Sequence, residues 1–329
     1  MADTMNRQRR RALQAAALIG TVGFPGLGRA LFPARPVEII VPGGAGGSTD
    51  VVARIIQLPG GGALGQPIVI DNRAGAGGIV GTLDAIRSEP DGYTMLLGSL
   101  GGHVLVPLLK PKVGFDTLRH LAPVTRLVNL PAIILATPDF PARNLTELIA
   151  LARASRQPLA YGTPGVGSTG HVIAELLCQR TGIKLLHVPY RTSSQSYTDL
   201  LGGRIPLLFT LITGVQQQVA SGRMKGVAVT TARRVSALPN VPTIEESGIR
   251  DFDIASWYGL MVPAGTPAPQ VDRLQRAIGE ALRSEEVRTR YEDIGAEVVG
   301  DTPMQFAAQL RADFKRWREV IQTANIVVD

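Results

Sequence analysis

Residues 37–50 have the sequence VEIIVPGGAGGSTD, and this stretch predicts how the chain folds. Its first part, Val37–Val41, is a short β-branched run that is typical of a strand. A turn with four glycines follows, and Thr49–Gln57 then has the pattern of a helix. A strand that passes through a glycine-rich turn into a helix is typical of α/β proteins. We therefore expect a ligand at the carboxyl end of this strand.

The alternation of strand and helix continues along the chain. Further strands are predicted at 68–70, 94–97, 159–161, 185–188, 205–209, 226–229 and 297–299, and helices at 145–154, 170–181, 195–201, 214–221 and twice within 268–326. This order predicts an α/β protein with parallel-rich sheets covered by helices on both faces. Because about 300 residues are more than one hydrophobic core usually supports, we expect two domains.

The N-terminus has the layout of a secretory signal peptide. Four arginines between positions 7 and 11 precede an apolar run, residues 12–27, that contains no charged residue. We therefore predict that residues 1–30 direct export to the periplasm and are cleaved near Ala30. The Sec and twin-arginine routes both remain open, and a buried N-terminal helix is the alternative interpretation.

The charge of the chain argues against a nucleic-acid partner. The formal net charge is +7, and residues 1–30 supply +4 of it through five arginines and one aspartate. The remaining residues therefore carry only +3, and no run rich in lysine, arginine and aromatic residues follows position 30. We predict no DNA or RNA partner.

The sequence does not have the patterns of common catalytic or metal sites. Ser168 has Val166 two positions before it, where the Gly-x-Ser-x-Gly motif of hydrolases needs a glycine. The four histidines show no metal-ligand spacing, and the single cysteine adds no ligand set. We predict a protein that is not an enzyme and binds no metal and no cofactor. His171 remains a candidate ligand contact, because it lies in the first turn of a predicted helix.

The loop at 42–50 suits an anion. Its glycines allow the backbone to approach a ligand closely, while Ser48 and Thr49 can cap the helix and still donate a hydroxyl. Unpaired N–H groups and the positive end of the helix dipole favour a negative charge at this position. The alternative is a strand-to-helix turn that binds no ligand.

A second loop, residues 161–171, has the sequence YGTPGVGSTGH and repeats this chemistry. Two such loops in one chain favour a cleft that both of them line. Gly165, Gly167 and Gly170 also fit the Gly-x-Gly-x-x-Gly pattern of dinucleotide sites. That pattern needs an acidic residue at the end of the next strand, which instead continues into Pro189-Tyr190-Arg191. The dinucleotide interpretation is therefore not favoured.

A set of short motifs follows in order along the chain. They are AGGSTD at 45–50, GQP at 65–67, NRAGAGG at 72–78, PDGYT at 90–94, YGTPGVGS at 161–168, VPY at 188–190, DLLGG at 199–203, LPNVPT at 238–243, SWYG at 256–259 and PAGTP at 263–267. With these motifs, the chain from Pro36 to Trp317 resembles the substrate-binding receptors of tripartite tricarboxylate transporters, also called the Bug family.

The resemblance implies a type II periplasmic binding-protein fold, in which two α/β domains are joined by two crossing strands around a ligand cleft. Domain 1 would comprise residues 31–130 and 237–329, and domain 2 the inserted residues 131–236. One carboxylate group of a small ligand would meet backbone amides and hydroxyls of both loops, in some members through water.

Carried over to this chain, these contacts fall on both glycine-rich loops. In the first loop they are Ala45, Gly46, Gly47 and Ser48, with Asp50 bracing the loop by accepting backbone N–H bonds. In the second loop they are Thr163, Gly165, Gly167, Ser168 and Thr169. The candidate ligand-binding set also includes Ser99, His171, Tyr190 and Thr210.

Three features depart from the family pattern. Gly43 stands where an aromatic residue is usual, which predicts a larger or more mobile pocket floor. Thr210 stands where many members have an aspartate, which argues for a ligand without an amine. Residues 58–62, LPGGG, are expected to interrupt the second half of the first helix, at a cost of about 3 kcal/mol for the proline and about 1 kcal/mol for each glycine.

Together these features predict a monomeric periplasmic receptor for a small carboxylate such as a di- or tricarboxylate. The receptor would deliver its ligand to the membrane subunits of a tripartite tricarboxylate-type transporter. The alternative is a ligand sensor, in which the liganded protein docks on a membrane signalling protein. Both functions use the same cleft, so the sequence leaves the choice between them, and the identity of the ligand, open.

Overall fold

The computed structural model describes residues 32–323 and Ile326. By its internal contacts the chain divides into residues 1–34 and residues 35–329. In the first part, only Phe32, Pro33 and Ala34 are described, and they lie outside helices and strands. The predicted signal peptide, residues 1–30, and its cleavage site therefore lie outside the described residues.

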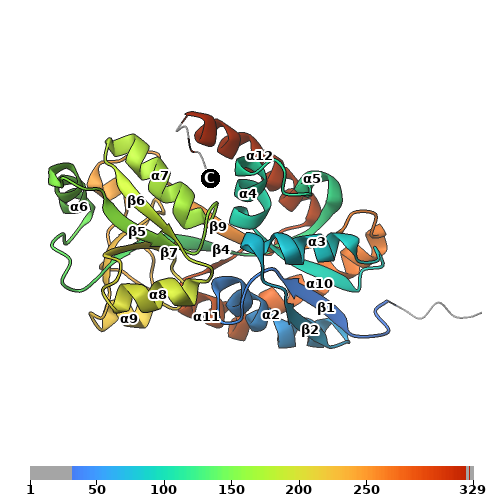
Figure 1. The fold of residues 1–329 in the computed structure, drawn as a ribbon. Coiled ribbons are helices and arrows are strands. Elements are labelled where there is room, and N and C mark those ends of the chain that lie inside the picture. Colours follow the sequence, from blue (N-terminus) through green and yellow to red (C-terminus); the bar gives the residue numbers. More distant parts are fainter. Residues whose placement is uncertain (1–31, 324–325, 327–329) are drawn as a thin grey trace, which may run out of the picture. The chain divides into compact units, whose positions relative to one another are not determined.

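The described part of residues 35–329 contains ten strands and the helices that connect them (Figure 1). The strands are β1 Val37–Val41, β2 Ile68–Asn72, β3 Thr94–Ser99, β4 Leu121–Ala136, β5 Leu159–Thr163, β6 Leu185–Pro189, β7 Leu207–Leu211, β8 Lys225–Val229, β9 Ala255–Pro263 and β10 Glu297–Val298. The helices are α2 Ser48–Leu64, α3 Ile79–Arg87, α4 Val106–Leu109, α5 Thr117–His120, α6 Leu145–Ala154, α7 Thr169–Thr181, α8 Ser193–Leu201, α9 Gln216–Ala220, α10 Ala268–Leu282, α11 Glu285–Asp293 and α12 Pro303–Thr323. Short helical turns are η2 Ala76–Gly78, η3 Gly101–Leu105 and η4 Glu245–Ser247.

The strands form one mixed sheet in the order β2-β1-β3-β9-β4-β7-β5-β6, with β8 and β10 also paired to β4. β1 pairs in parallel with β2 and β3, and β5 pairs in parallel with β6 and β7. Every pairing of β4 and β9 is antiparallel. The sheet therefore consists of two groups of parallel strands that are connected through β4 and β9.

β4 holds the two groups together because it changes partners along its length. Residues 121–131 pair with β9, whereas residues 132–136 pair with β7 and β8. All residues from Leu130 to Ala136 are buried. The predicted domain boundary after residue 130 falls at this change of partners, and the division into two domains stays a prediction.

The sequence predicted most of the parallel strands and missed the two that connect them. β1 and α6 have the predicted bounds, and β7 begins two residues later than predicted. β4 and β9 were not predicted. β9 and the second half of β4 are buried on both faces, and such a strand shows no alternation of polar and apolar residues.

The first helix is not interrupted, contrary to the prediction from residues 58–62. α2 continues through Pro59 and ends at Leu64, and Gly65 then adopts the left-handed conformation with φ 79°. The proline removes one backbone N–H from the helix, but helical residues continue on both sides of it.

Close packing explains the glycines of this helix. A Cβ atom at Gly60 would lie 2.9 Å from Ile278 Cδ1 of α10, and one at Gly61 would lie 3.2 Å from the backbone nitrogen of Ile68 in β2. By contrast, no atom lies within 4 Å of the position that a Cβ atom would take at Gly62. Two of the three glycines therefore let α2 approach its neighbours.

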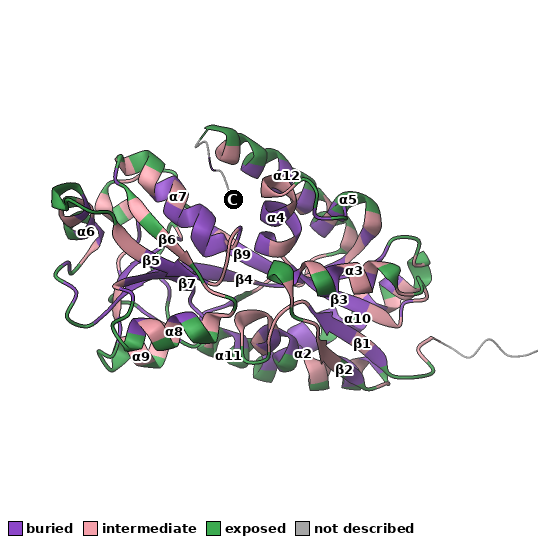
Figure 2. Ribbon diagram, in the orientation of Figure 1, coloured by how far each residue is buried: buried purple, intermediate pink, exposed green. Residues whose placement is uncertain are grey.

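The core lies between the sheet and the helices that cover both of its faces. Figure 2 shows buried strands and helices whose outward sides are exposed. All five residues of β7 are buried, and α7 and α8 pack on opposite faces of this part of the sheet (Figure 1). Within residues 32–323, no helix has the length and apolar character that crossing a membrane would require.

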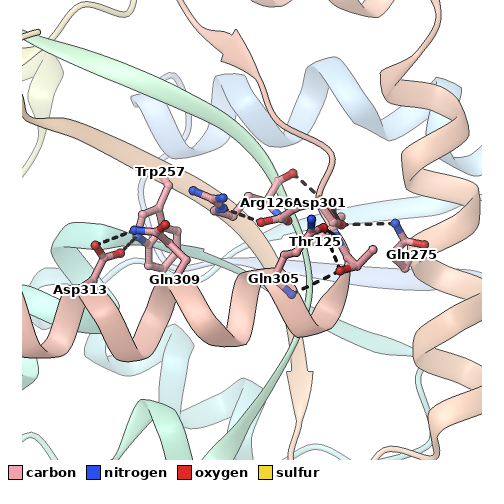
Figure 3. A network of polar contacts seen from close by, with 9 residues as sticks. Thr125, Arg126, Trp257, Gln275, Asp301, Gln305, Gln309 and Asp313 are labelled. Atoms are coloured by element: carbon pink, nitrogen blue, oxygen red, sulfur yellow. Dashed lines mark hydrogen bonds and ion pairs between the residues drawn. The ribbon is translucent and has the colours of Figure 1, made fainter. Parts of the chain in front are cut away.

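Two largely buried carboxylates fasten α12 to the connecting strands (Figure 3). Asp301, just before α12, accepts hydrogen bonds from the backbone N–H and the Nε of Arg126 in β4, each at 2.7 Å. Asp313 on α12 accepts from Trp257 Nε1 in β9 at 2.8 Å. Burial raises the pKa of Asp313, while the bonds from Trp257 and Gln309 oppose this rise. α12 is thereby fixed against the two strands that link the parallel groups.

Replacing Gly62 by alanine is expected to raise the free energy of unfolding by about 0.5–1 kcal/mol, because alanine is the better helix former and its Cβ meets no atom. Gly61→Ala should gain less or destabilise the protein, because its Cβ would press on the backbone of Gln66 and Ile68, each at 3.2 Å. Urea denaturation of both variants measures the difference. Equal stabilisation by both would contradict the close packing at Gly61.

Candidate functional site

A cavity of about 830 Å³ opens where the parallel strands of both groups end. In α/β proteins ligands collect at this edge, because helix N-termini and loops meet there. The volume lies within the range of about 300–1,000 Å³ that is usual for small-molecule sites. Six of its lining residues lie at or just after the carboxyl ends of strands: Pro42 after β1, Ala74 after β2, Ser99 of β3, Pro164 after β5, Pro189 of β6 and Thr210 of β7.

The first glycine-rich loop is held by Asp50, as predicted. The Asp50 carboxylate accepts from the backbone N–H of Gly46 at 2.9 Å, from Arg54 Nε at 2.9 Å and from Asn72 Nδ2 at 3.0 Å. Asn72 also donates to the carbonyl oxygen of Gly43 at 3.1 Å. Burial opposes ionisation of Asp50, but the bonds from Arg54, Gly46 and Asn72 together lower its pKa. The loop is therefore fixed from behind by an ionised carboxylate.

The second loop is held in the same manner by His171. The backbone N–H of Gly167 donates to His171 Nδ1 at 3.2 Å, so the ring proton lies on Nε2. Thr163 Oγ1 accepts from the backbone N–H of Gly165 at 3.2 Å and donates to its carbonyl at 3.1 Å. Ser168 caps α7 by accepting from the His171 N–H at 3.3 Å.

Backbone conformation and close packing explain the glycines of the second loop, without a nucleotide ligand. Gly165 and Gly167 have φ values of 140° and 79°, and residues that have a Cβ atom rarely adopt such values. Gly170 packs directly on β7, where a Cβ atom would overlap the carbonyl group of Phe209. The Gly-x-Gly-x-x-Gly pattern here serves the turn and the contact between helix and sheet.

Helices α2, α3, α7 and α8 begin at the cavity. The amides of Ser48 and Thr49 in α2, and those of Thr169 and Gly170 in α7, lie in the first turn, where a helix provides no acceptor. These N–H groups and the positive helix ends favour an anion. Among the described residues that line the cavity, none is an aspartate or a glutamate. The site is thus suited to a negatively charged group.

Most of the predicted site residues line the cavity. They are Ala45, Gly47, Ser48, Ser99, Gly165, Gly167, Ser168, Thr169, Tyr190 and Thr210. The other predicted residues, Gly46, Asp50, Thr163 and His171, are not part of the lining, and their hydrogen bonds hold the two loops in shape. The Tyr190 hydroxyl donates to Asp199 at 2.9 Å, so the tyrosine lines the cavity while its hydroxyl is engaged elsewhere.

The cavity also has lining residues that sequence reasoning did not select. Ser256 and Tyr258 come from β9, and their SWYG motif was noticed only as part of the family pattern. Lys110 follows α4, and Arg191 follows β6. Ser256 and Tyr258 lie on a strand that the sequence did not predict, and Lys110 and Arg191 lie in connecting segments. These four residues were therefore recognised as lining residues only in the fold.

The rings of the buried His171 and the partly buried His187 stack beneath the second loop. The rings of His171 and His187 lie 4.0 Å apart at an angle of 12°. Burial lowers the pKa of each to about 4, and the positive charge of Lys110 acts in the same direction on His171. Glu175 Oε1 lies 3.9 Å from His171 Nε2, which is too long for a hydrogen bond and does not outweigh burial. Both rings are therefore neutral near pH 7.

Residues 32–323 hold no group of three or more histidine, cysteine, aspartate or glutamate side chains that could bind a metal. Two groups of parallel strands with an anion-suited cavity at their carboxyl ends are the arrangement expected of a solute-binding protein. Residues 52–326 match the family described as TctC, tripartite tricarboxylate transporter family receptor. The chain belongs to this family.

Solved structures agree with this assignment. The periplasmic binding protein BugD is 34% identical, with a TM-score of 0.85 over 90% of this chain and 99% of BugD. MatC from Rhodopseudomonas palustris, solved with malate, is 32% identical, with a TM-score of 0.83 over 88% of this chain and all of MatC. Rpa4515 from R. palustris, solved with adipate, is 33% identical, with a TM-score of 0.86 over 90% of this chain and 99% of that protein.

These similarities confirm two predictions from the sequence. The fold is the α/β fold of periplasmic binding proteins, although the sheet is mixed because β4 and β9 run antiparallel to their neighbours. The family is that of the tripartite tricarboxylate transporter receptors, which are substrate-binding proteins and not enzymes.

The lowered pKa values of His171 and His187 predict that stability falls in weak acid. The pKa of His171 and of His187 drops from 6.5 to about 4 on folding, so between these values the unfolded chain binds more protons than the folded one. Stability therefore rises with pH in this window and is lost as the pH falls through it. His171→Asn keeps an acceptor on Cγ for the Gly167 N–H but cannot take up a proton.

Urea denaturation at pH 7.5 and pH 5 tests this expectation. The wild-type protein should lose about 1–2 kcal/mol more of its unfolding free energy between these pH values than His171→Asn does. An equal loss in both proteins would show that His171 is not held neutral by the fold.

Proposed function

We propose that this protein captures a small carboxylate in the cavity and delivers it to the membrane subunits of a tripartite tricarboxylate-type transporter. One observation supports this proposal above all: the N-termini of α2 and α7 both lie at the cavity, and none of its described lining residues is an aspartate or a glutamate. The malate and adipate solved with two similar proteins support the same class of ligand.

In this proposal one ligand carboxylate accepts hydrogen bonds from both glycine-rich loops. The first-turn amides of α2 and α7 would supply N–H donors, and Ser48 and Ser168 would add hydroxyls. Charged acceptors make such bonds worth about 1.5–3 kcal/mol each. Because donors from both parallel groups must surround one carboxylate, ligand binding would favour the closed arrangement of the two groups.

The closing parts would be the two predicted domains, residues 31–130 with 237–329 and residues 131–236. Contacts across the cavity support a closed state. Thr169 Oγ1 of α7 lies 3.4 Å from Ser256 Oγ of β9, and a Cβ atom at Gly101 would lie 3.4 Å from Thr169 Oγ1. We further propose that residues 1–30 export the protein to the periplasm and that it acts there as a monomer.

Ser48→Ala tests the anion site with the least damage to the fold. Ser48 begins α2, and the helix is capped by Gly47 without a side-chain bond, whereas Ser168 caps α7 through its hydroxyl. Loss of one hydroxyl bond to a carboxylate is expected to weaken binding about ten- to a hundredfold, measured by isothermal titration with malate and adipate. The unfolding free energy should stay within about 0.5 kcal/mol of the wild-type value.

Ser247→Ala, in η4 and away from the cavity, is the matched control and should bind as the wild type does. A carboxylate at a hundred times its dissociation constant should stabilise the wild-type protein by about 2.7 kcal/mol, and NAD or ATP should not. Stabilisation by a nucleotide and by no carboxylate would overturn the proposed ligand class.

A further inference from the structure

Two cationic side chains line the cavity, and neither belongs to a glycine-rich loop. Lys110 follows α4 on the side of the first parallel group, and Arg191 stands between β6 and α8 on the side of the second. Of the described residues in the lining, they are the only lysine and the only arginine. The cavity therefore carries two positive charges in addition to its helix ends.

Neither charge is compensated within the part of the chain that the structure describes. Arg54, Arg73, Arg126, Arg204 and Arg234 each contact a carboxylate. The side chains of Lys110 and Arg191 make no ion pair and no hydrogen bond with any of residues 32–323. Lys110 is partly buried, whereas Arg191 is exposed. A partly buried cation without a counter-ion is costly, and an anionic ligand would offset that cost.

The two cations flank the loops from opposite sides. Val106, one helical turn before Lys110, packs on the second loop, where a Cβ atom at Gly167 would lie 3.1 Å from Val106 Cγ2. Thr192, next to Arg191, reaches the first loop, where a Cβ atom at Gly44 would lie 3.8 Å from Thr192 Cγ2. A ligand carboxylate held by the loops would thus have both cations within the same cavity.

We propose that Lys110 and Arg191 bind a second carboxylate of the ligand, so that the site selects dicarboxylates over monocarboxylates and amino acids. This inference rests on the proposed function, because it assumes that the loops hold the first carboxylate. A monocarboxylate would leave both cations without a partner. An amino acid would bring an ammonium group into a cavity whose described lining offers two cations and no acid.

The test compares ligands that differ in one carboxylate. Succinate, glutarate and adipate are titrated beside butyrate, pentanoate and hexanoate, which have the same numbers of carbon atoms. The wild-type protein should bind the best dicarboxylate at least about tenfold more tightly than its monocarboxylate. Lys110→Met and Arg191→Gln should each weaken dicarboxylate binding about tenfold, because the lost contact is a partly screened charge pair. Monocarboxylate binding should weaken much less, because a monocarboxylate lies farther from the two cations.

Lys112→Met and Arg223→Gln are the matched controls, because both side chains are exposed and neither lines the cavity. Both controls should keep the wild-type preference for dicarboxylates. If mono- and dicarboxylates bind alike and the two cavity variants change neither, the second subsite is overturned while the proposed function stands. If no carboxylate of either series binds, the proposed function itself is overturned.

Discussion

One kind of hydrogen bond holds three strand-to-helix turns around the cavity, and the anion site depends on it. In each turn, a backbone N–H donates to a side chain four residues further on. The pairs are Gly46 with Asp50, Ser99 with His103, and Gly167 with His171. The bond satisfies one amide of the turn internally and fixes the direction of the backbone. The next amides, which have no acceptor in their own helix, therefore stay directed at one place instead of sampling many.

The side chain that accepts the backbone hydrogen bond is charged in the first loop and neutral in the second. Asp50 is ionised and 2% exposed, and Arg54 and Asn72 hold its charge behind the first loop. In the second loop the acceptor is the neutral ring of His171, which needs no counter-ion. A second ionised acid there would place an uncompensated negative charge beside α7 and weaken the attraction of its N-terminus for an anion. The fold thus builds two similar turns while keeping the cavity free of negative charge.

The sequence predicted those parts of the site that are local in the chain. A glycine-rich turn between a strand and a helix is visible in residues 42–50 and 161–171. The role of Asp50 in the first turn came from the resemblance to the receptor family. β4 and β9 were missed because burial on both faces removes the polar alternation that marks a strand. The course of α2 through Pro59 was mispredicted, because helix propensity does not include the contacts that Gly60 and Gly61 make with α10 and β2. Lys110 and Arg191 could not be found, because only the fold brings their loops to one cavity.

Arg191 connects the rejected dinucleotide interpretation with the proposed carboxylate site. A dinucleotide fold places an acidic residue at the end of the strand after its glycine-rich loop, where the acid holds a ribose hydroxyl. In this chain β6 ends at Pro189, and the residue that follows Tyr190 at this position is a cation that lines the cavity. A cation there offers a ribose hydroxyl no acceptor, but it attracts a carboxylate. A cation in place of an acid at this loop therefore favours a carboxylate over a dinucleotide, whereas the glycine pattern alone does not distinguish the two ligands.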